Sequence, residues 1–202
     1  NLEKYDEWKD DPDMINDVMR FLDNVLSDFI NKAPDQFQDA KYSAERERSV
    51  GLGVMGFHSF LQKKRIPLES VMAKSWNKKI FKNIDEKVNQ ASKDLAEERG
   101  ACPDAAEYGY KERFSNKTAI APTASISIIC GGASPGVEPI AANSYTHKTL
   151  SGSFNVRNRY LEEILENHGK NDDETWSTIT TNQGSVSHLD FLTDLEKDVF
   201  KT

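Results

Sequence analysis

Apolar residues recur at helical spacing near the start of the chain. Five of them follow one another at steps of three or four residues, with Asp and Asn between them: Ile15, Val18, Leu22, Val25 and Phe29. This spacing places their side chains on one face of a helix. Pro12 suits the first turn, and Ala33-Pro34 ends the pattern. The sequence therefore predicts an amphipathic helix over residues 12–33 with this face turned to a core.

A second helical pattern is longer. It runs from about Glu69 to Arg99 and carries a regular apolar stripe, formed by Ile80, Ile84, Val88, Ala91 and Leu95. Gly100 follows where a C-terminal cap is expected. We expect a long helix that buries this stripe.

Shorter patterns complete the outline. Helices are predicted at residues 58–64, 158–167 and 172–180, and a short strand at residues 117–121. The glycine-rich stretch 49–57 predicts a strand or a tight turn. Helices that alternate with short apolar strands indicate the α/β class.

Composition narrows the class of protein. The 202 residues are 37% hydrophobic, which is enough for one domain with a core or for part of a larger one. No apolar run reaches the ~20 residues of a membrane span, and a net charge of −7 argues against nucleic acid as a partner. Two cysteines favour a reducing cytoplasm. The chain begins with Asn rather than Met, and no Gly or Pro marks its last residues. We therefore expect both ends to be cuts through a longer protein.

Three glycines match a dinucleotide-binding fingerprint. Gly51, Gly53 and Gly56 have the spacing G-x-G-x-x-G, and Glu69 lies near the usual distance for a ribose-binding acid. That fingerprint requires a buried strand before the first glycine, whereas the charged residues 45–48 precede it here. The context favours glycines that permit close backbone packing.

A segment of small hydroxyl residues is the stronger candidate site. Pro122 favours a turn, and Thr123 and Ser125 place hydroxyl groups beside backbone N–H groups. If a helix starts here, its free N–H donors and the positive end of its dipole suit a phosphate. The alternation of Ser and Ile over residues 125–128 is equally typical of a half-buried strand, so both interpretations stay open.

The remaining reactive side chains predict no catalytic or metal site. Cys102 and Cys130 share no ligand spacing and are interpreted as small packing residues. Glu138 is expected to brace its loop by accepting backbone N–H bonds. Four histidines are expected at the surface or the core edge rather than on a metal: His58, His147, His168 and His188.

Several segments, in this order and at this spacing, resemble the large, catalytic subunit of aerobic ribonucleotide reductases. The similarity covers essentially the whole chain and rests on Asn1-Leu2, Arg48–Phe57, Leu95–Pro103, Ala119–Ser127, Gly136–Pro139, Tyr145–Gly152 and Gly184–Leu189. The resemblance implies a ten-stranded α/β barrel made of two five-stranded parallel halves. Residues 1–202 would form a helix-rich, partial barrel domain, incomplete at both ends.

The resemblance also implies a role for the hydroxyl-rich segment. In the family this segment holds the phosphates of the substrate, a ribonucleoside diphosphate. Thr123 and Ser125 would bind through their hydroxyl groups, and Ala124 and Ile126 through backbone N–H groups, after the turn made by Pro122. Gly51–Gly56 would then be a barrel strand with its turn.

The complete enzyme that the resemblance implies replaces the ribose 2′-hydroxyl with hydrogen by cysteine-radical chemistry. The family's Asn-x-Cys-x-Glu motif is absent from this sequence, so the segment is expected to carry no catalytic residue and no cofactor and to be inactive alone. Its implied partners are the remainder of the large subunit and a radical-generating small subunit with a dinuclear metal centre. A thioredoxin-type reductant and ATP or dNTP effectors are also implied.

Three alternatives remain open. An adenosylcobalamin-dependent reductase has a similar Pro-Thr-Gly-Thr segment, although Ala124 in place of the glycine favours the class with a small subunit; cobalamin dependence decides between them. A dinucleotide-dependent oxidoreductase built on Gly51, Gly53 and Gly56 would bind NAD or NADP in a titration. A non-catalytic orphan fragment is the third alternative, and aggregation of the chain alone would favour a fragment over an autonomous module.

Overall fold

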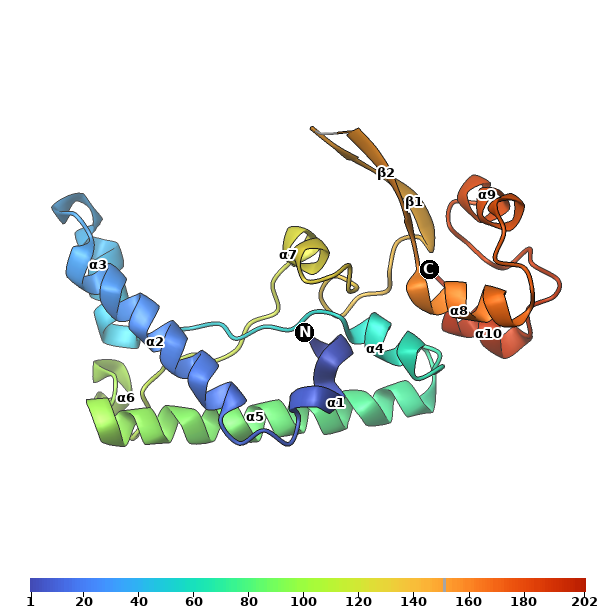
Figure 1. Cartoon of the computed structure of the whole chain (residues 1–202). Helices are drawn as coiled ribbons and strands as arrows, with labels where there is room; N and C mark the ends of the chain where they lie inside the picture. The colour runs from blue at the N-terminus through green and yellow to red at the C-terminus, as the bar shows by residue number, and fades with distance from the viewer. Residues whose placement is uncertain (151) are drawn as a thin grey trace. The chain divides into compact units, whose positions relative to one another are not determined.

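The computed structural model of the chain describes residues 1–150 and 152–202, so Ser151 of the segment Tyr145–Gly152 lies outside the described residues. Helices and strands follow in the order η1 (Leu2–Lys4), α1 (Tyr5–Trp8), α2 (Met14–Lys32), η2 (Asp35–Phe37), α3 (Gln38–Glu47), α4 (Phe57–Lys63), α5 (Val71–Arg99), α6 (Pro103–Glu107), α7 (Ala124–Ile129), β1 (Ser144–Thr149), β2 (Gly152–Arg157), α8 (Arg159–Asn167), α9 (Asp173–Thr181) and α10 (Asp194–Val199) (Figure 1).

These elements form two compact units, each with its own buried residues. The first unit comprises Asn1–Tyr5, Met55–Trp76 and Pro122–Thr202, and the second comprises Asp6–Val54 and Asn77–Ala121. Helix α5 is continuous and contributes residues to both units. Among the residues described, no helix combines the length and the apolar composition required to cross a membrane.

Helix α2 of the second unit begins at Met14 and buries a different face from the predicted one. Its buried residues are Ile15, Met19, Asp23 and Ile30. Ile15 of the predicted stripe is buried, but Val25 of that stripe is 50% exposed and Phe29 is 39% exposed. The prediction of the buried face was wrong because the pattern treated Asp23 as a surface residue, whereas ion pairs hold it in the interior.

Asp23 is fully buried and shared by three arginines. Its Oδ1 accepts hydrogen bonds from Arg48 at 2.6 Å and from Arg113 at 2.9 Å, and its Oδ2 accepts one from Arg99 at 2.8 Å. Burial alone would raise the pKa of Asp23, but the hydrogen bonds from Arg113, Arg99 and Arg48 outweigh it and hold that pKa below its ordinary value. These contacts join α2 to the end of α3, to the end of α5 and to the loop at residue 113.

Helix α5 confirms the long helix predicted from the second stripe. All five stripe residues are buried: Ile80, Ile84, Val88, Ala91 and Leu95. Gly100 follows the helix with φ +87°, and its N–H donates to Ala96 O at 2.9 Å. A left-handed residue at this position satisfies a terminal carbonyl of the helix, as the C-cap prediction required.

The two predicted strands of the second unit are reduced to one parallel bridge. Leu52 pairs with Thr118, and the Ala119 N–H donates to Leu52 O at 3.1 Å. Neither segment continues as a regular strand within the described residues. Gly51 and Gly53 give the segment little side-chain surface, so a longer strand here has few contacts that would stabilise it.

One hydrophobic core of the first unit lies among α8, α9, α10 and the loop before α10. Its buried residues are Tyr160, Leu161, Ile164, Leu165, Trp176, Ile179, Val186, Leu189, Leu192, Val199 and Phe200. Asn158, Asp172 and Thr193 cap the three helices through their side chains. The helices predicted at residues 158–167 and 172–180 are therefore confirmed.

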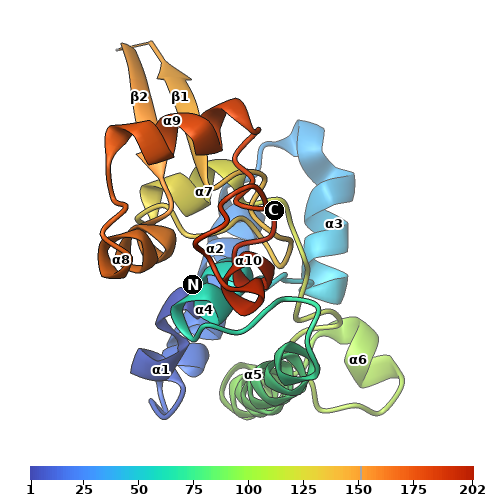
Figure 2. The ribbon, with the colours of Figure 1, turned by 90° about the vertical axis from the view of Figure 1, so that its right-hand side faces the viewer.

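Strands β1 and β2 form an antiparallel hairpin that the sequence did not predict. Their register runs from Ser144 opposite Arg157 to Thr149 opposite Gly152. The hairpin extends outward beyond α9 of the same unit (Figures 1 and 2). Its few large apolar side chains are exposed, so the segment lacks the strong alternation by which a half-buried strand is recognised.

Candidate functional site

The hydroxyl-rich segment of the first unit forms a turn followed by a helix. Thr123 occupies the N-cap position of α7, and Ser127 is the first residue whose N–H bonds back, to Thr123 O at 2.8 Å. The strand interpretation of residues 125–128 is therefore wrong. We call residues 122–126 the α7 turn.

The α7 turn presents a set of backbone donors. The N–H groups of Ala124, Ser125 and Ile126 belong to the first turn of the helix, where no carbonyl of the helix is available to them. No hydrogen bond from these three groups occurs within the described part of the chain, and all three residues are exposed. The positive end of the helix dipole lies at the same place.

The Thr123 hydroxyl does not cap α7. Its Oγ1 accepts the N–H of Gly136 at 2.8 Å. A hydroxyl oxygen that accepts one hydrogen bond still carries its own hydrogen as a donor. Thr123 can therefore donate to a ligand at the turn while the loop that follows α7 fixes the position of its oxygen.

The loop from Ala133 to Ile140 packs against α4. Ser134 and Ser59 form a reciprocal pair, in which each hydroxyl oxygen accepts the backbone N–H of the other residue. Glu138 Oε2 accepts the Val137 N–H at 2.8 Å, which confirms the predicted bracing role of Glu138. This loop places Gly136 beside Thr123.

A buried carboxylate that the sequence did not reveal lies at the other end of α7. Glu3 accepts a short hydrogen bond from the Tyr160 hydroxyl and forms an ion pair with Arg159 at 3.0 Å. Arg159 also donates to Gly131 O at 2.7 Å, just after α7. Burial is the larger cause that raises the pKa of Tyr160, and the hydrogen bond to Glu3 is the next. The Tyr160 hydroxyl therefore stays protonated. Only the fold brings residues 3, 131 and 159 together.

Two predictions about single side chains were wrong. His58 is fully buried rather than at the core edge, and its Nδ1 accepts the Ile140 N–H at 3.0 Å. Burial lowers the pKa of His58 to about 4, so the ring is neutral near pH 7. Cys130 is exposed after α7 rather than packed, whereas Cys102 is buried as expected. Among the described residues, no group of three or more His, Cys, Asp or Glu side chains could hold a metal ion.

Two glycines of the fingerprint pack closely against another segment of the chain. A Cβ on Gly51 would lie 2.9 Å from the Ala119 Cβ, and a Cβ on Gly53 would lie 2.7 Å from the Ala119 carbonyl oxygen. Ala119 thus packs directly against the backbone of both glycines. The interpretation of Gly51 and Gly53 as close-packing residues is supported by this contact.

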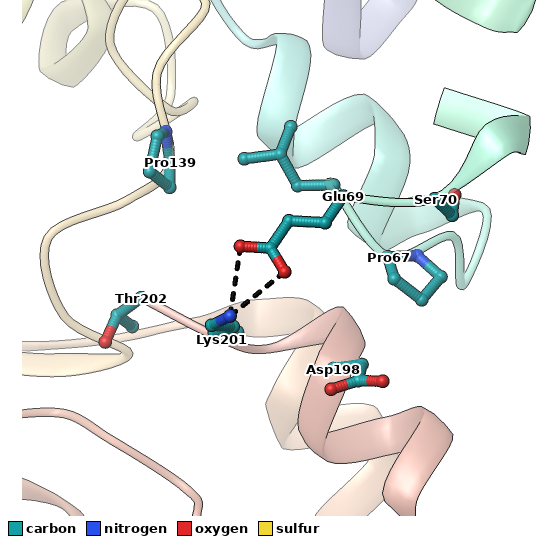
Figure 3. A pocket seen from close by; sticks show the side chains of 8 residues that line it. Pro67, Glu69, Ser70, Pro139, Asp198, Lys201 and Thr202 are labelled. Atoms are coloured by element: carbon teal, nitrogen blue, oxygen red, sulfur yellow. Dashed lines mark hydrogen bonds and ion pairs between the residues drawn. The ribbon is translucent and has the colours of Figure 1, made fainter. Parts of the chain in front are cut away.

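Two hollows lie elsewhere. One in the first unit, of about 270 Å³, is bordered by Pro67 and Pro139 and spanned by Glu69, whose two carboxylate oxygens each lie 3.0 Å from Lys201 Nζ (Figure 3). One in the second unit, of about 380 Å³, is lined mainly by apolar side chains such as Phe81 and Ile84. Neither includes a residue of the α7 turn, and four of the five residues of the turn are exposed at the surface of this chain.

Known proteins resemble the chain over its whole length. The family model of the ribonucleotide reductase barrel domain matches residues 1–112 and 104–202. The ribonucleoside-diphosphate reductase large subunit of Invertebrate iridescent virus 6 is 49% identical over 100% of this chain and 21% of its own length. The vitamin B12-dependent ribonucleoside-diphosphate reductase of Thermoplasma acidophilum is 39% identical over 75% of this chain and 21% of its own length.

A solved structure gives the same result for the fold. The alpha subunit of the class Id ribonucleotide reductase of Actinobacillus ureae is 41% identical, with a TM-score of 0.91 over 100% of this chain and 37% of that one. The prediction of a helix-rich part of an α/β barrel is confirmed by this match and by the family model. The chain spans between about a fifth and just over a third of the length of these relatives.

Proposed function

The chain belongs to the ribonucleotide reductase barrel domain family, and from that premise we propose that it is the part of a ribonucleoside-diphosphate reductase large subunit that holds the substrate's phosphates. The complete subunit would reduce ribonucleoside diphosphates to 2′-deoxyribonucleotides by cysteine-radical chemistry. Residues 1–202 would be one partial barrel domain of that subunit.

The observation that carries this proposal is the α7 turn. Three backbone N–H groups, those of Ala124, Ser125 and Ile126, lie at the exposed start of α7. None of them has a hydrogen-bond acceptor among the described residues. The hydroxyl groups of Thr123 and Ser125 add two further donors beside them. A diphosphate offers many acceptor oxygens and negative charge, which suits this set of donors and the helix dipole.

The function of the turn would be positional. A diphosphate held by the turn fixes one end of the nucleotide, so that the ribose lies at a constant distance from the reacting groups. Those groups would come from the remainder of the large subunit, which also supplies the radical cysteine. No residue of this chain is assigned a bond-breaking role.

The complete enzyme would need partners that the chain itself does not contain. We expect a separate small subunit that generates the radical at a dinuclear metal centre, a thioredoxin-type reductant and ATP or dNTP effectors. Support comes from the alpha subunit of the Actinobacillus ureae enzyme, which matches the whole chain. We also expect a cytoplasmic location, as the composition suggested.

A second candidate is a vitamin B12-dependent reductase. The Thermoplasma acidophilum enzyme of that kind is 39% identical over three quarters of the chain. The whole-chain match at 49% identity to a large subunit, together with Ala124 in place of the glycine of the cobalamin class, favours the first candidate. Activity of the complete enzyme with added adenosylcobalamin and no small subunit would decide for the second.

The test of the phosphate site is the double substitution Thr123→Val with Ser125→Ala in the complete large subunit. Each lost hydrogen bond to a charged group contributes ~1.5–3 kcal/mol, so we expect the two substitutions together to lower nucleoside diphosphate affinity by at least ~100-fold in a subunit that still folds. The matched control, Ser177→Ala with Thr181→Val, removes one serine and one threonine hydroxyl from exposed positions of α9. Unchanged affinity in the first variant would remove the assignment of this site.

A further inference from the structure

We propose that the buried hydroxyl pair formed by Ser59 and Ser134 is a positioning element for the substrate's phosphates, because it fixes the loop that holds Thr123. This inference rests on the proposed function of the α7 turn. It assigns a role to two serines that do not themselves belong to the turn. The pair is expected to act through Gly136 and not by contact with the nucleotide.

Helix α7 has little apolar burial to hold it in place. It has six residues, of which only Ser127 is buried. Ile126, Ile128 and Ile129 are all exposed, Ile129 at 83%. A helix of this length is marginal without tertiary packing. Its position must therefore depend on polar contacts at its ends.

The contact at the N-terminal end is the hydrogen bond from the Gly136 N–H to Thr123 Oγ1 at 2.8 Å. Gly136 is two residues after Ser134, whose own backbone is held twice. The Ser134 N–H donates to Ser59 Oγ at 2.8 Å, and the Ser134 carbonyl accepts the Gly56 N–H at 2.7 Å. In return, the Ser134 hydroxyl accepts the Ser59 N–H at 3.1 Å.

Ser59 and its neighbour hold the loop at two points. His58 Nδ1 accepts the Ile140 N–H at 3.0 Å, while Ser59 holds residue 134. The low pKa of His58 keeps the ring neutral, which a nitrogen that accepts a hydrogen bond requires. Consecutive residues of α4 thus fix both ends of the stretch that contains Gly136.

Helix α4 is a rigid support for these contacts. Every residue from Phe57 to Gln62 is buried. The Phe60 ring meets the Tyr5 ring at a centroid distance of 5.9 Å and the Trp76 ring at 5.2 Å, both edge to face. Since this packing does not involve the Ser59 hydroxyl, removal of that hydroxyl should free the loop and leave α4 in place.

The serine pair suits this role because the hydroxyl oxygen of each serine accepts a hydrogen bond from the backbone N–H of the other. Loss of one hydroxyl leaves the partner's buried N–H without its acceptor, which allows the loop to move towards water. The displaced loop would carry Gly136 away from Thr123. The effect on the nucleotide should therefore be confined to its phosphates.

The experiment compares two ligands in the complete large subunit. A nucleoside diphosphate and the corresponding nucleoside share base and ribose, and only the first reaches the α7 turn with phosphates. We expect Ser59→Ala to weaken diphosphate binding about fivefold, the effect of one net hydrogen bond, and to leave nucleoside binding unchanged. Ser59→Thr keeps the hydroxyl and should restore the diphosphate affinity.

A matched control exists in the other unit. Ser92 is a fully buried serine of α5 whose hydroxyl accepts the Arg113 N–H at 3.1 Å. Ser92→Ala makes the same chemical change, and we expect it to lower the melting temperature without changing either affinity. If Ser59→Ala unfolds the subunit, the milder Ser134→Ala, which keeps the contact from the Ser134 N–H, should show a smaller loss, again for the diphosphate alone.

The failures of the two proposals are distinguishable. If Thr123→Val weakens diphosphate binding but Ser59→Ala does not, the positioning role is wrong and the phosphate site stands. Equal losses for nucleoside and diphosphate in Ser59→Ala would also overturn the positioning role. If it is correct, Ser59→Ala adds little to Thr123→Val, because both act on one contact. If Thr123→Val has no effect on the diphosphate, the phosphate site itself is wrong, and the positioning role fails with it.

Discussion

At the scale of single residues, Asp23 makes an interior charge tolerable by sharing it among three arginines. We expect Asp23→Asn to reduce the free energy of unfolding by ~3 kcal/mol, because the substitution leaves Arg48, Arg99 and Arg113 without their common carboxylate. Chemical denaturation measures this change. The control is Asp28→Asn on the same helix, which removes only an exposed ion pair with Lys32 and should change stability by less than about 1 kcal/mol.

The same carboxylate gives a pH dependence with a definite sign. The folded-state pKa of Asp23 lies below its ordinary value of 3.8, so the stability it contributes is complete above pH 3.8 and is lost as the pH falls through the folded pKa. We expect the difference in unfolding free energy between the wild type and Asp23→Asn to be constant near neutral pH and to shrink in acid. A difference that grew in acid would contradict this assignment.

At the scale of elements, the parallel bridge of Leu52 and Thr118 depends on glycines that admit Ala119. We expect Gly51→Ala to destabilise the second unit by ~1–3 kcal/mol, because the new Cβ would meet the Ala119 Cβ at 2.9 Å. Ala119→Gly should recover part of this loss. The same second change should not rescue Gly53→Ala, which meets the Ala119 carbonyl oxygen instead. Thermal unfolding of the two double variants compares them directly.

Elements were predictable where one local signal decided them. The stripe from Ile80 to Leu95 is regular and has a glycine stop, so α5 followed from its sequence. Helix α2 has two apolar faces, and only the positions of three distant arginines decide that the face with Asp23 is the buried one. The hairpin and the Ser59–Ser134 contact depend on segments that meet in the fold, so spacing along the chain did not reveal them. The α7 turn was recognised from its residues, but its choice of helix over strand was not.

At the scale of the whole molecule, the exposed apolar side chains carry a prediction of their own. Phe21 is 63% exposed on α2, and Leu150 and Ile129 are exposed in the other unit. Exposed apolar surfaces are normally covered by another part of the polypeptide or by a partner protein. We expect the 202-residue chain expressed alone to self-associate, and Phe21→Lys with Val25→Lys to reduce the association. Sedimentation velocity measures it, and a monodisperse monomer at tens of micromolar would contradict the expectation.

The reciprocal contact between Ser59 and Ser134 also sets an order of events during folding. The two serines are 75 residues apart in the chain, so their meeting requires the closure of a long loop, whereas α7 is a local helix. A six-residue helix is marginal on its own, so a nascent chain that has not closed this loop lacks both a stable α7 and a correctly placed Thr123. We expect the capacity to hold a diphosphate to appear late, only after residue 134 has been synthesised and has docked on α4.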